Sequence, residues 1–396
     1  MSIKQIIIRM LPQRMIIILR KALLSTEHSI LIEPEKSLNI VSTVKEANFE
    51  DSFYPECFEH CKEQHLEVFI PAEYMFLEPN ASVNLNSDVV ITEKGVYWEK
   101  FNIEEFLTWA RPSDCNVVWF DKTHIFIKKA KRNEYIAGKT LSLVGVWSNH
   151  WGHCMYQYLP KLYSAGEAGV LNQPINVLVA YNEDKTILEI INHYLHNFPQ
   201  ARLVFAQPDT DYVCEELYFM PCPGSSFNNP NFRLDYPYYI SRHVLDKTKK
   251  YIIDPIIEKI KQNPTKHEKL FLGRPGLRRT LSNYEEVHDY FKSMGYIDVD
   301  GASLTLEEKA DLFYHAKEVC GMYGSAFLNL MFCNHAKSLC FLNYRMSTDT
   351  SLYLQIRDYV SVLVNVTGSD EDDTYHSNFY IPLDKVKRAY RQYIQN

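Results

Sequence analysis

The sequence has no low-complexity segment, no obvious internal repeat and no cysteine framework. Its nine cysteines are odd in number and scattered, a pattern that argues against disulfide stapling and suits a reducing compartment. Basic residues are in deficit, since 42 Lys and Arg face 49 Asp and Glu and leave a net charge of -7. This balance argues against a nucleic-acid partner. These absences leave an ordinary globular protein.

The chain is long enough for two domains, because it has 396 residues of which 46% are hydrophobic. Short apolar runs alternate with helix-like segments, which is typical of parallel α/β organisation. We predict a first lobe over residues 1–235 and a second lobe over 238–375. A helical run at 239–261 is expected to cross between the two lobes. The last segment, 376–396, is helical in pattern and is expected to pack back on the first lobe.

Acidic residues are missing from residues 1–25, where basic residues are interleaved with two isoleucine-rich runs. Charges and Pro12 interrupt this stretch too often for a membrane span, and it has no clear signal-peptide cleavage site. One interpretation is an amphipathic helix in which residues 1–24 contact an anionic inner leaflet. The other is a first amphipathic element of the N-terminal lobe, with residues 6–8 as a strand. The basic residues are Lys4, Arg9, Arg14, Arg20 and Lys21.

Small residues are concentrated in the run from Gly321 to Asn329, which includes Gly324 and Ser325. An apolar, strand-like segment precedes this run and a helix-like segment follows it. A strand, a tight turn and a helix in that order favour an anion site, because the backbone can approach the ligand and the helix start offers N–H groups. The same turn also occurs where a helix packs tightly on a sheet, and both interpretations stay open at this point.

Arginines follow the strand-like segment 269–273: Arg274 comes directly after it, and Arg278 and Arg279 come soon afterwards. The guanidinium group is planar and permanently charged, so it suits bidentate binding of phosphate. A solvated basic loop is the alternative interpretation, although such a loop usually mixes in lysines and acids. Asn283 and an acidic, helix-like segment follow.

These residues resemble the C-terminal pattern of glycosyltransferase family 61, which is associated with capsular polysaccharide synthesis. That pattern has an arginine after a strand, an Arg-Arg pair, an Asn before an acidic helix, a helix ending in Leu-Phe, and a closing Gly-x-His-Gly-Ala-Gly-Leu-x-Asn. The corresponding positions here are Arg274, Arg278, Arg279, Asn283, Leu312, Phe313 and the run from Gly321 to Asn329. The chain departs from the pattern at Lys309, Tyr323, Ser325 and Ala326, and in one extra residue before Asn283.

A second element of the same family appears earlier in the chain. Family members carry His-Trp, then Glu, then Leu-Pro-Arg-Leu, and this chain resembles that pattern from Gly152 to Leu162. His153 is kept, whereas Gln157 replaces the glutamate. The two elements together span roughly residues 140 to 345, and their occurrence in order is more specific than either alone.

The resemblance implies an α/β fold of GT-B type, with two Rossmann-like lobes, parallel sheets and a cleft between them. It implies an inverting glycosyltransferase that takes sugar from a nucleoside-diphosphate donor, most often a UDP-sugar, without metal or other cofactor. The acceptor would be a glycan or lipid-linked glycan in the synthesis of capsule, lipopolysaccharide or another surface glycoconjugate. The enzyme would be cytoplasmic, or peripheral on the inner face of the membrane. A catalytically inactive homologue that binds nucleotide-sugar or glycan is the alternative.

Inverting transfer needs one group that accepts the proton of the acceptor hydroxyl and others that stabilise the departing diphosphate. We assign the first role to His153, whose imidazole titrates near working pH; a packed histidine at the lobe interface is the alternative. Lobe closure is expected to bring His153 opposite Ser325. The donor diphosphate is assigned to Arg274, Arg278, Arg279, Tyr323, Gly324, Ser325 and Asn329. Acceptor binding or positioning is assigned to His150, Gln157, Asn283 and Lys309.

Three assignments carry their own alternatives. If the family's glutamate is the proton acceptor, Gln157 impairs the protein, because an amide cannot act as a base; if the glutamate only positions an acceptor sugar, Gln157 can still do so by hydrogen bonding, and we favour this second role. Lys309 is either a further phosphate contact or part of a solvated helix face. Tyr323 is either a hydrogen-bonding hydroxyl or a core residue.

Metal chemistry has little support in the sequence. The triplets 209–211 and 298–300 both spell Asp-x-Asp, a pattern of metal-dependent transferases, but a chain with 49 acids contains such triplets by chance. Cys57 and Cys61 are spaced too widely for the usual zinc knuckle. No metal site is predicted.

Overall fold

The computed structural model describes residues 26–395 except 71, 86, 99–113, 115, 121–122, 182–184, 222–223, 226–238, 275–277, 302, 345–352, 354–355 and 373–376. The predicted membrane contact of residues 1–24 and the predicted lobe boundary at 235–238 lie outside these residues. Among the residues described, no helix is long and apolar enough to cross a membrane.

The first sheet is mixed, with strand order β13-β12-β11-β14-β6-β7-β8 and with β2 paired to β6. The strands β13, β12, β11 and β14 run parallel, and β6 joins β14 in the antiparallel direction. Helices α6 and α7 pack on one face of this sheet through buried residues. The bounds are β2 (Ile40–Lys45), β6 (Glu73–Asn84), β7 (Val89–Thr92), β8 (Gly95–Trp98), β11 (Arg132–Ser142), β12 (Ile175–Ala180), β13 (Ala201–Ala206), β14 (Thr210–Phe219), α6 (Leu159–Glu167) and α7 (Lys185–Leu195).

The second sheet has strand order β18-β17-β19-β20-β21-β22 and is parallel except for the pairing of β22 with β21. Its side chains alternate between two cores, as the period of two in a strand requires. Leu270 and Leu272 face the core shared with α9 and α11, whereas Phe271 faces the core shared with α10 and α13. The bounds are β17 (Lys269–Leu272), β18 (Ile297–Asp298), β19 (Glu318–Met322), β20 (Ala336–Asn343), β21 (Val360–Asp370), β22 (Phe379–Tyr380), α9 (Asp254–Ile260), α10 (Tyr284–Ser293), α11 (Leu306–Tyr314) and α13 (Leu383–Tyr390).

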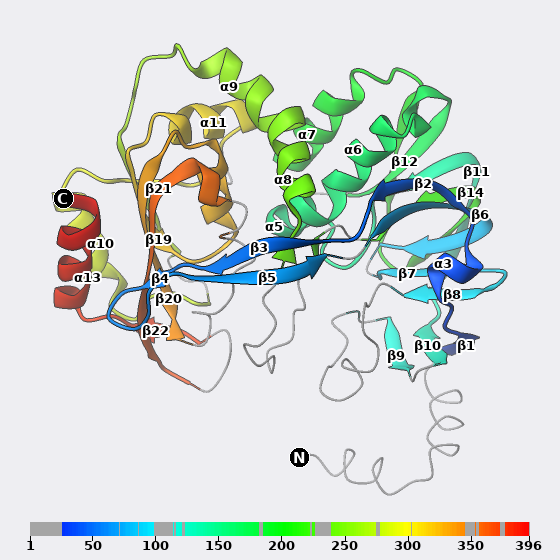
Figure 1. The fold of residues 1–396 in the computed structure, drawn as a ribbon, viewed down its shortest axis with the longest axis horizontal. Coiled ribbons are helices and arrows are strands. Elements are labelled where there is room, and N and C mark those ends of the chain that lie inside the picture. Colours follow the sequence, from blue (N-terminus) through cyan, green and yellow to red (C-terminus); the bar gives the residue numbers. More distant parts are fainter. Residues whose placement is uncertain are drawn as a thin grey trace, which may run out of the picture.

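A continuous hydrophobic core joins the two sheets. It includes Leu141 and Ile190 from the side of the first sheet and Leu270 and Phe313 from the side of the second. The helical run predicted at 239–261 is present as α8 (Arg242–Thr248), a π-helical turn η3 (Lys249–Ile253) and α9, and Figure 1 shows it between the two halves. This run contacts α6 at one end and α11 at the other.

The C-terminal helix contacts the predicted first lobe, because Phe58 lies in the same hydrophobic core. Most of its apolar face packs on the second sheet, where Tyr390 of α13 and Ile394 of the π-helical turn η7 (Arg391–Gln395) share that core with Phe291 of α10. The physical reason is that α10 leaves an apolar face of the second sheet only partly covered, and α13 covers the rest.

A segment early in the chain also reaches the second sheet. The hairpin of β3 (Asn48–Tyr54) and β5 (Gln64–Ile70) extends across the front of the molecule in Figure 1. Between its strands, β4 (Glu56–Cys57) pairs with β21. The architecture confirms a mixed α/β fold with parallel strands, whereas the GT-B assignment and the lobe boundaries stay predictions.

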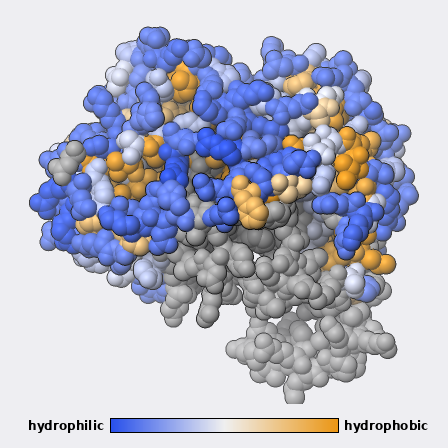
Figure 2. Space-filling view, viewed as in Figure 1, coloured by the Kyte–Doolittle hydropathy of each residue, from blue (hydrophilic) through white to orange (hydrophobic). Residues whose placement is uncertain are grey.

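The remaining described elements are short. A small antiparallel sheet has the order β1-β10-β9, and β15 pairs with β16. In the view of Figure 2 the described surface is mainly hydrophilic, with hydrophobic residues in separate patches. The bounds are β1 (Thr26–Ile30), β9 (Val117–Phe120), β10 (His124–Lys128), β15 (Gly224–Ser225), β16 (Tyr239–Ile240), α3 (Pro34–Ser37), η2 (Val170–Asn172) and η6 (Arg357–Tyr359).

Candidate active site

The segment that carries His153 is a helix with a π-helical turn inside it. It consists of α5 (Trp151–His153), the π turn η1 (Cys154–Tyr158) and α6, and it follows the carboxyl end of β11. In open α/β sheets, ligands bind outside the carboxyl ends of the strands, and π turns inside helices are frequent at functional sites. Its position therefore makes this segment a candidate for the active site.

The helix start packs directly against the small-residue turn of the second sheet. A Cβ atom placed on Gly152 would lie 3.6 Å from the Cβ of Ser325 and 3.6 Å from Cδ1 of Leu328. Both partners belong to η4 (Ser325–Phe332), which is a 3-10 helix rather than a regular α-helix. The structure thus brings together the two sequence elements, which are separated by about half of the chain.

His153 is oriented by its neighbour one helical turn away. Its Nδ1 lies 2.9 Å from Oε1 of Gln157, which is only 8% exposed. An amide oxygen can only accept, so Nδ1 carries the proton and donates it, and Nε2 is left with its lone pair. Burial lowers the pKa of His153 to about 4, so the ring is neutral at physiological pH.

Trp147 packs over the same imidazole and was not found by sequence analysis. The centroids of the two rings are 4.7 Å apart. The backbone of Trp147 is left-handed, with a φ of 63°, a conformation that is strained for a bulky residue. Strain of this kind clusters at functional sites. His150, which was assigned to positioning, meets the His153 ring edge-on with a centroid separation of 6.4 Å.

Two carboxylates, Asp88 just before β7 and Asp114 before β9, hold the loop that precedes this helix. Oδ1 of Asp88 accepts hydrogen bonds from the amide of Val146 at 2.9 Å and from the hydroxyl of Tyr158 at 3.0 Å. Asp114 accepts in turn from the amide of Asp88 at 2.9 Å. Burial and the nearby Asp88 raise the pKa of Asp114 to about 6. No motif marked either residue, because their partners lie far away in the sequence.

Arg274 follows the carboxyl end of β17 and lies across Gly324. Its Nη1 donates to the carbonyl oxygen of Tyr323 at 3.3 Å. A Cβ atom on Gly324 would collide with this guanidinium, so the close approach requires glycine there. Burial, with Arg279 nearby, lowers the pKa of Arg274 to about 10, which still leaves it charged at neutral pH. Within the described part of the chain its buried Nε has no hydrogen-bond partner.

The other two arginines differ in their surroundings. Arg279 has a left-handed backbone, with a φ of 60°, and lies near enough to Arg274 to affect its pKa. Arg278 is exposed. In the structure Arg279 therefore lies near Arg274, whereas Arg278 is exposed to solvent.

The side chains of the small-residue turn play unequal parts. Tyr323 is 6% exposed and packs on Tyr353 with a ring separation of 5.6 Å, which favours the core interpretation for its ring. Ser325 is exposed at the start of η4. Asn329 is buried; its Nδ2 donates to the carbonyl oxygen of Ala326 at 3.0 Å, and its Oδ1 has no partner among the described residues.

Lys309 does not belong to a solvated helix face, so that interpretation is wrong. The residue is only 3% exposed. Its Nζ donates to Oγ1 of Thr186 in α7 and lies 5.5 Å from the ring centroid of Trp151. Because α11 belongs to the second sheet and α7 to the first, Lys309 connects the two halves beside the start of the His153 helix.

The hydrogen bonds of Asn283 join the start of α10 to the segment before α13. Its Nδ2 donates to Oε2 of Glu286 at 2.8 Å and to the carbonyl oxygen of Ile381 at 2.9 Å. These contacts fix the start of α10 against the segment before α13. Their local character indicates a structural part for Asn283, and its predicted positioning role stays a prediction.

The Asp-x-Asp triplets have local partners. Asp209 pairs with Lys131, and Asp298 lies 2.9 Å from Nε2 of His288. No group of three or more His, Cys, Asp or Glu residues suited to hold a metal occurs in the part of the chain that the structure describes.

Comparison with known proteins links the two halves of this site. The family model described as Glycosyltransferase 61 matches residues 151–340. The match begins at the first residue of α5 and runs into β20, so it includes His153, Arg274 and Gly324. No curated protein matches the chain. Over residues 151–340 the chain is therefore similar to glycosyltransferase family 61, and this match supports a glycosyltransferase.

Proposed function

We propose that this protein is an inverting transferase that moves a sugar from a nucleoside-diphosphate donor, a UDP-sugar by preference, to a glycan or lipid-linked glycan acceptor. Capsule, lipopolysaccharide or a related surface glycoconjugate would be the product. The observation that carries the proposal is the packing of Gly152, next to a neutral His153, against the turn where the half-buried Arg274 lies on Gly324. We expect the base and the anion site to face the same bound donor.

The anion site is supported by the electrostatics of Arg274. Burying a guanidinium costs several kcal/mol unless an opposite charge offsets the lost hydration. In the described part of the structure no carboxylate pairs with Arg274, and only Arg279 acts on its charge. A diphosphate would supply the missing anion, and two guanidinium groups would stabilise its growing charge as the sugar departs. This arrangement supports transfer without a divalent ion.

The strength of His153 as a base depends on whether the nucleotide-sugar donor is bound. With a pKa of about 4 in the free protein, His153 is available as a base over the whole physiological range but accepts a proton weakly. A bound diphosphate brings negative charge near the ring and favours the imidazolium form, so the pKa of His153 should rise in the complex. Nucleotide-sugar binding would thereby adjust the base for proton transfer.

Gln157 has a defined part in this mechanism. By accepting from Nδ1 of His153 it keeps the lone pair on Nε2 and fixes the orientation of the ring. This role needs an acceptor oxygen but no charge, and glutamine supplies one. The replacement of the family's glutamate is therefore compatible with activity.

The test is a screen of donor binding and turnover against UDP-, GDP-, TDP- and CMP-sugars, with EDTA in parallel. We expect one nucleotide to raise the melting temperature regardless of EDTA, Arg274→Ala to abolish this shift, and His153→Ala to keep the shift but lose turnover. Arg278→Ala, which changes an exposed arginine, is the matched control and should resemble wild type. Loss of the shift with EDTA would overturn metal independence.

The inactive homologue remains the second candidate because of Gln157. Donor hydrolysis in the absence of acceptor separates the two, since a protein that only binds does not turn donor over. If binding occurs, no donor is hydrolysed and Gln157→Glu restores hydrolysis, the binding-only function is correct.

We also propose peripheral attachment to the cytoplasmic face of the membrane through residues 1–24, which lie outside the described residues. The basic residues listed above, with no acid among them, support attraction to anionic lipid. Flotation on anionic vesicles should fall when residues 1–24 are removed, and unchanged flotation would contradict the proposal.

A further inference from the structure

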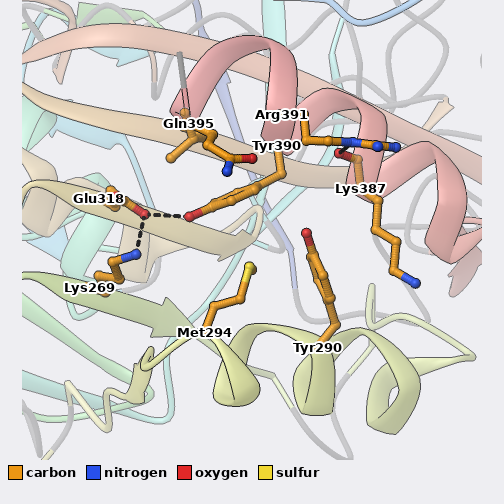
Figure 3. Close-up of a pocket in the computed structure, with 9 residues that line it drawn as sticks. Lys269, Tyr290, Met294, Glu318, Lys387, Tyr390, Arg391 and Gln395 are labelled. Carbon is orange, nitrogen blue, oxygen red and sulfur yellow. Dashed lines mark hydrogen bonds and ion pairs between the residues drawn. The ribbon is translucent and has the colours of Figure 1, made fainter.

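A pocket of about 490 Å³ lies at the edge of the second sheet away from the candidate active site. Figure 3 shows it between α10, which contributes Tyr290 and is followed by Met294, and the C-terminal helix, which contributes Lys387 and Arg391. Its volume is within the range of about 300–1,000 Å³ that is usual for ligand pockets. Nothing in the mechanism proposed above uses it.

The pocket is separate from the donor site because the two lie at opposite ends of the same strands. Lys269 and Glu318 line the pocket and are the first residues of β17 and β19. Arg274 and Gly324 follow the last residues of these parallel strands. At about 3.3 Å per residue, strands of this length place the two sites roughly 13–16 Å apart.

The pocket presents positive charge. Lys387 and Arg391 are one turn apart on the C-terminal helix, and neither has a carboxylate partner among the described residues. The one acid in the lining, Glu318, is already engaged: it accepts from the hydroxyl of Tyr390 at 3.0 Å and pairs with Nζ of Lys269 at 3.5 Å. Two uncompensated cations therefore remain at the pocket.

The rest of the lining is aromatic and amphipathic. Nζ of Lys387 lies 5.5 Å from the ring centroid of Tyr290, so the cation and the aromatic face adjoin one another. In Figure 3 the Tyr290 ring stands between the two helices, with its hydroxyl directed toward the C-terminal helix. Rings with a polar tip suit ligands that have both an apolar face and hydroxyl groups, as a pyranose has.

We propose that this pocket is a second binding site, for a saccharide unit that carries a carboxylate or a phosphate. Lys387 and Arg391 bind the anionic group, and Tyr290 packs on the sugar ring. The choice of a saccharide over a simple anion rests on the proposed transferase function. In that setting the pocket holds a charged unit of the glycan at a distance from the reacting end.

The test is calorimetric titration of full-length protein with glucose 6-phosphate, with a glucuronate-containing oligosaccharide, with glucose and with inorganic phosphate. We expect at least one of the two anionic saccharides to bind at least tenfold more tightly than glucose or phosphate. Binding of glucose 6-phosphate would identify a sugar phosphate as the ligand, and binding of the oligosaccharide would identify a glycan. The double variant K387Q/R391Q should weaken this binding at least tenfold. Arg388→Gln changes a cation on the same helix that pairs with Glu59 outside the pocket, and should change the affinity less than twofold.

Thermal melts of the variants confirm that they fold. Arg274→Ala removes the proposed donor site and leaves this pocket intact. If the Arg274→Ala variant still binds anionic saccharide, the pocket proposal holds independently of the proposed donor site. Equal binding of phosphate and saccharide would overturn the assignment to a sugar. Binding that is unchanged in K387Q/R391Q, or no binding by wild type, would overturn the site itself.

Discussion

The two halves of the candidate site differ in the kind of electrostatics that they contribute. The half built on the first sheet offers an uncharged imidazole, because burial lowers the pKa of His153 to about 4. The half built on the second sheet offers Arg274, which keeps its charge despite burial. A neutral base on one half and a fixed cation on the other suit a reaction in which the proton acceptor must stay unprotonated while the leaving group is anionic. Each half can therefore be tested by itself.

The largest effect is expected at the charged half. Arg274→Ala should lower kcat/KM about 10³-fold, because it removes a half-buried guanidinium that we expect to stabilise the negative charge growing on the departing diphosphate. Arg274→Lys should recover little, since an ammonium group lacks the bidentate geometry of guanidinium. Steady-state kinetics with the identified donor provides the measurement. An equal loss in the exposed Arg278→Ala would show that the charge acts at long range and not at the site.

Substitution in the neutral half should lower catalysis somewhat less than substitution of Arg274. His153→Ala should lower kcat about 10²-fold, the lower end for general base catalysis, because a base with a pKa of about 4 is weak. Donor affinity should stay within threefold of wild type in direct titration. A parallel loss of donor affinity would instead assign His153 to binding, and would contradict the division between the two halves.

The same imidazole should make stability depend on pH. The pKa of His153 is lower in the folded protein than in the unfolded chain, so its contribution is present above about pH 6.5 and is lost as pH falls toward 4. Between pH 7 and pH 5 this loss is about 2 kcal/mol in the free energy of unfolding. Urea denaturation at both pH values measures it. His153→Gln should lose about 2 kcal/mol less over the same interval, and an identical loss would place the ring in solvent.

A smaller effect is expected where the guanidinium touches the backbone. Gly324→Ala should weaken donor binding about tenfold, since a methyl group there would displace Arg274. The backbone of Gly324 is extended and tolerates alanine, so the melting temperature should change little. Gly301→Ala is the matched control, because its new Cβ would meet only an ordinary contact 3.5 Å from Nδ2 of Asn329. Similar weakening in both variants would remove the steric explanation.

The smallest effect concerns the link between Gln157 and His153. Gln157→Glu places a carboxylate on Nδ1 and should raise the pKa of His153 by favouring the imidazolium form. The acid limb of the kcat/KM profile should then move to higher pH, with a change in kcat at neutral pH of about threefold to tenfold. A profile that does not move would show that Gln157 is not the residue that orients the ring.

Much of the site was predicted from sequence where its residues are contiguous. Arg274 after β17 and the turn at Gly324 after β19 were found because a strand, a turn and a helix follow one another in the chain. For Lys309 the interpretation as part of a solvated helix face was wrong. Its hydrogen-bond partner Thr186 comes from the other half of the molecule, so no local pattern indicated its burial. Asp88 was missed for the same reason, since it meets Val146 only through the fold.

The sequence by itself determined the alternating α/β pattern, the two family elements and the small-residue turn at Gly324. These features are local, because periodicity, turn chemistry and motif spacing involve residues within a few turns of each other. Only the tertiary structure decided that Gly152 packs on Ser325, that α13 covers the second sheet and that Lys387 and Arg391 face a pocket. Such contacts depend on which apolar faces remain uncovered once each sheet forms, and no local pattern records that outcome.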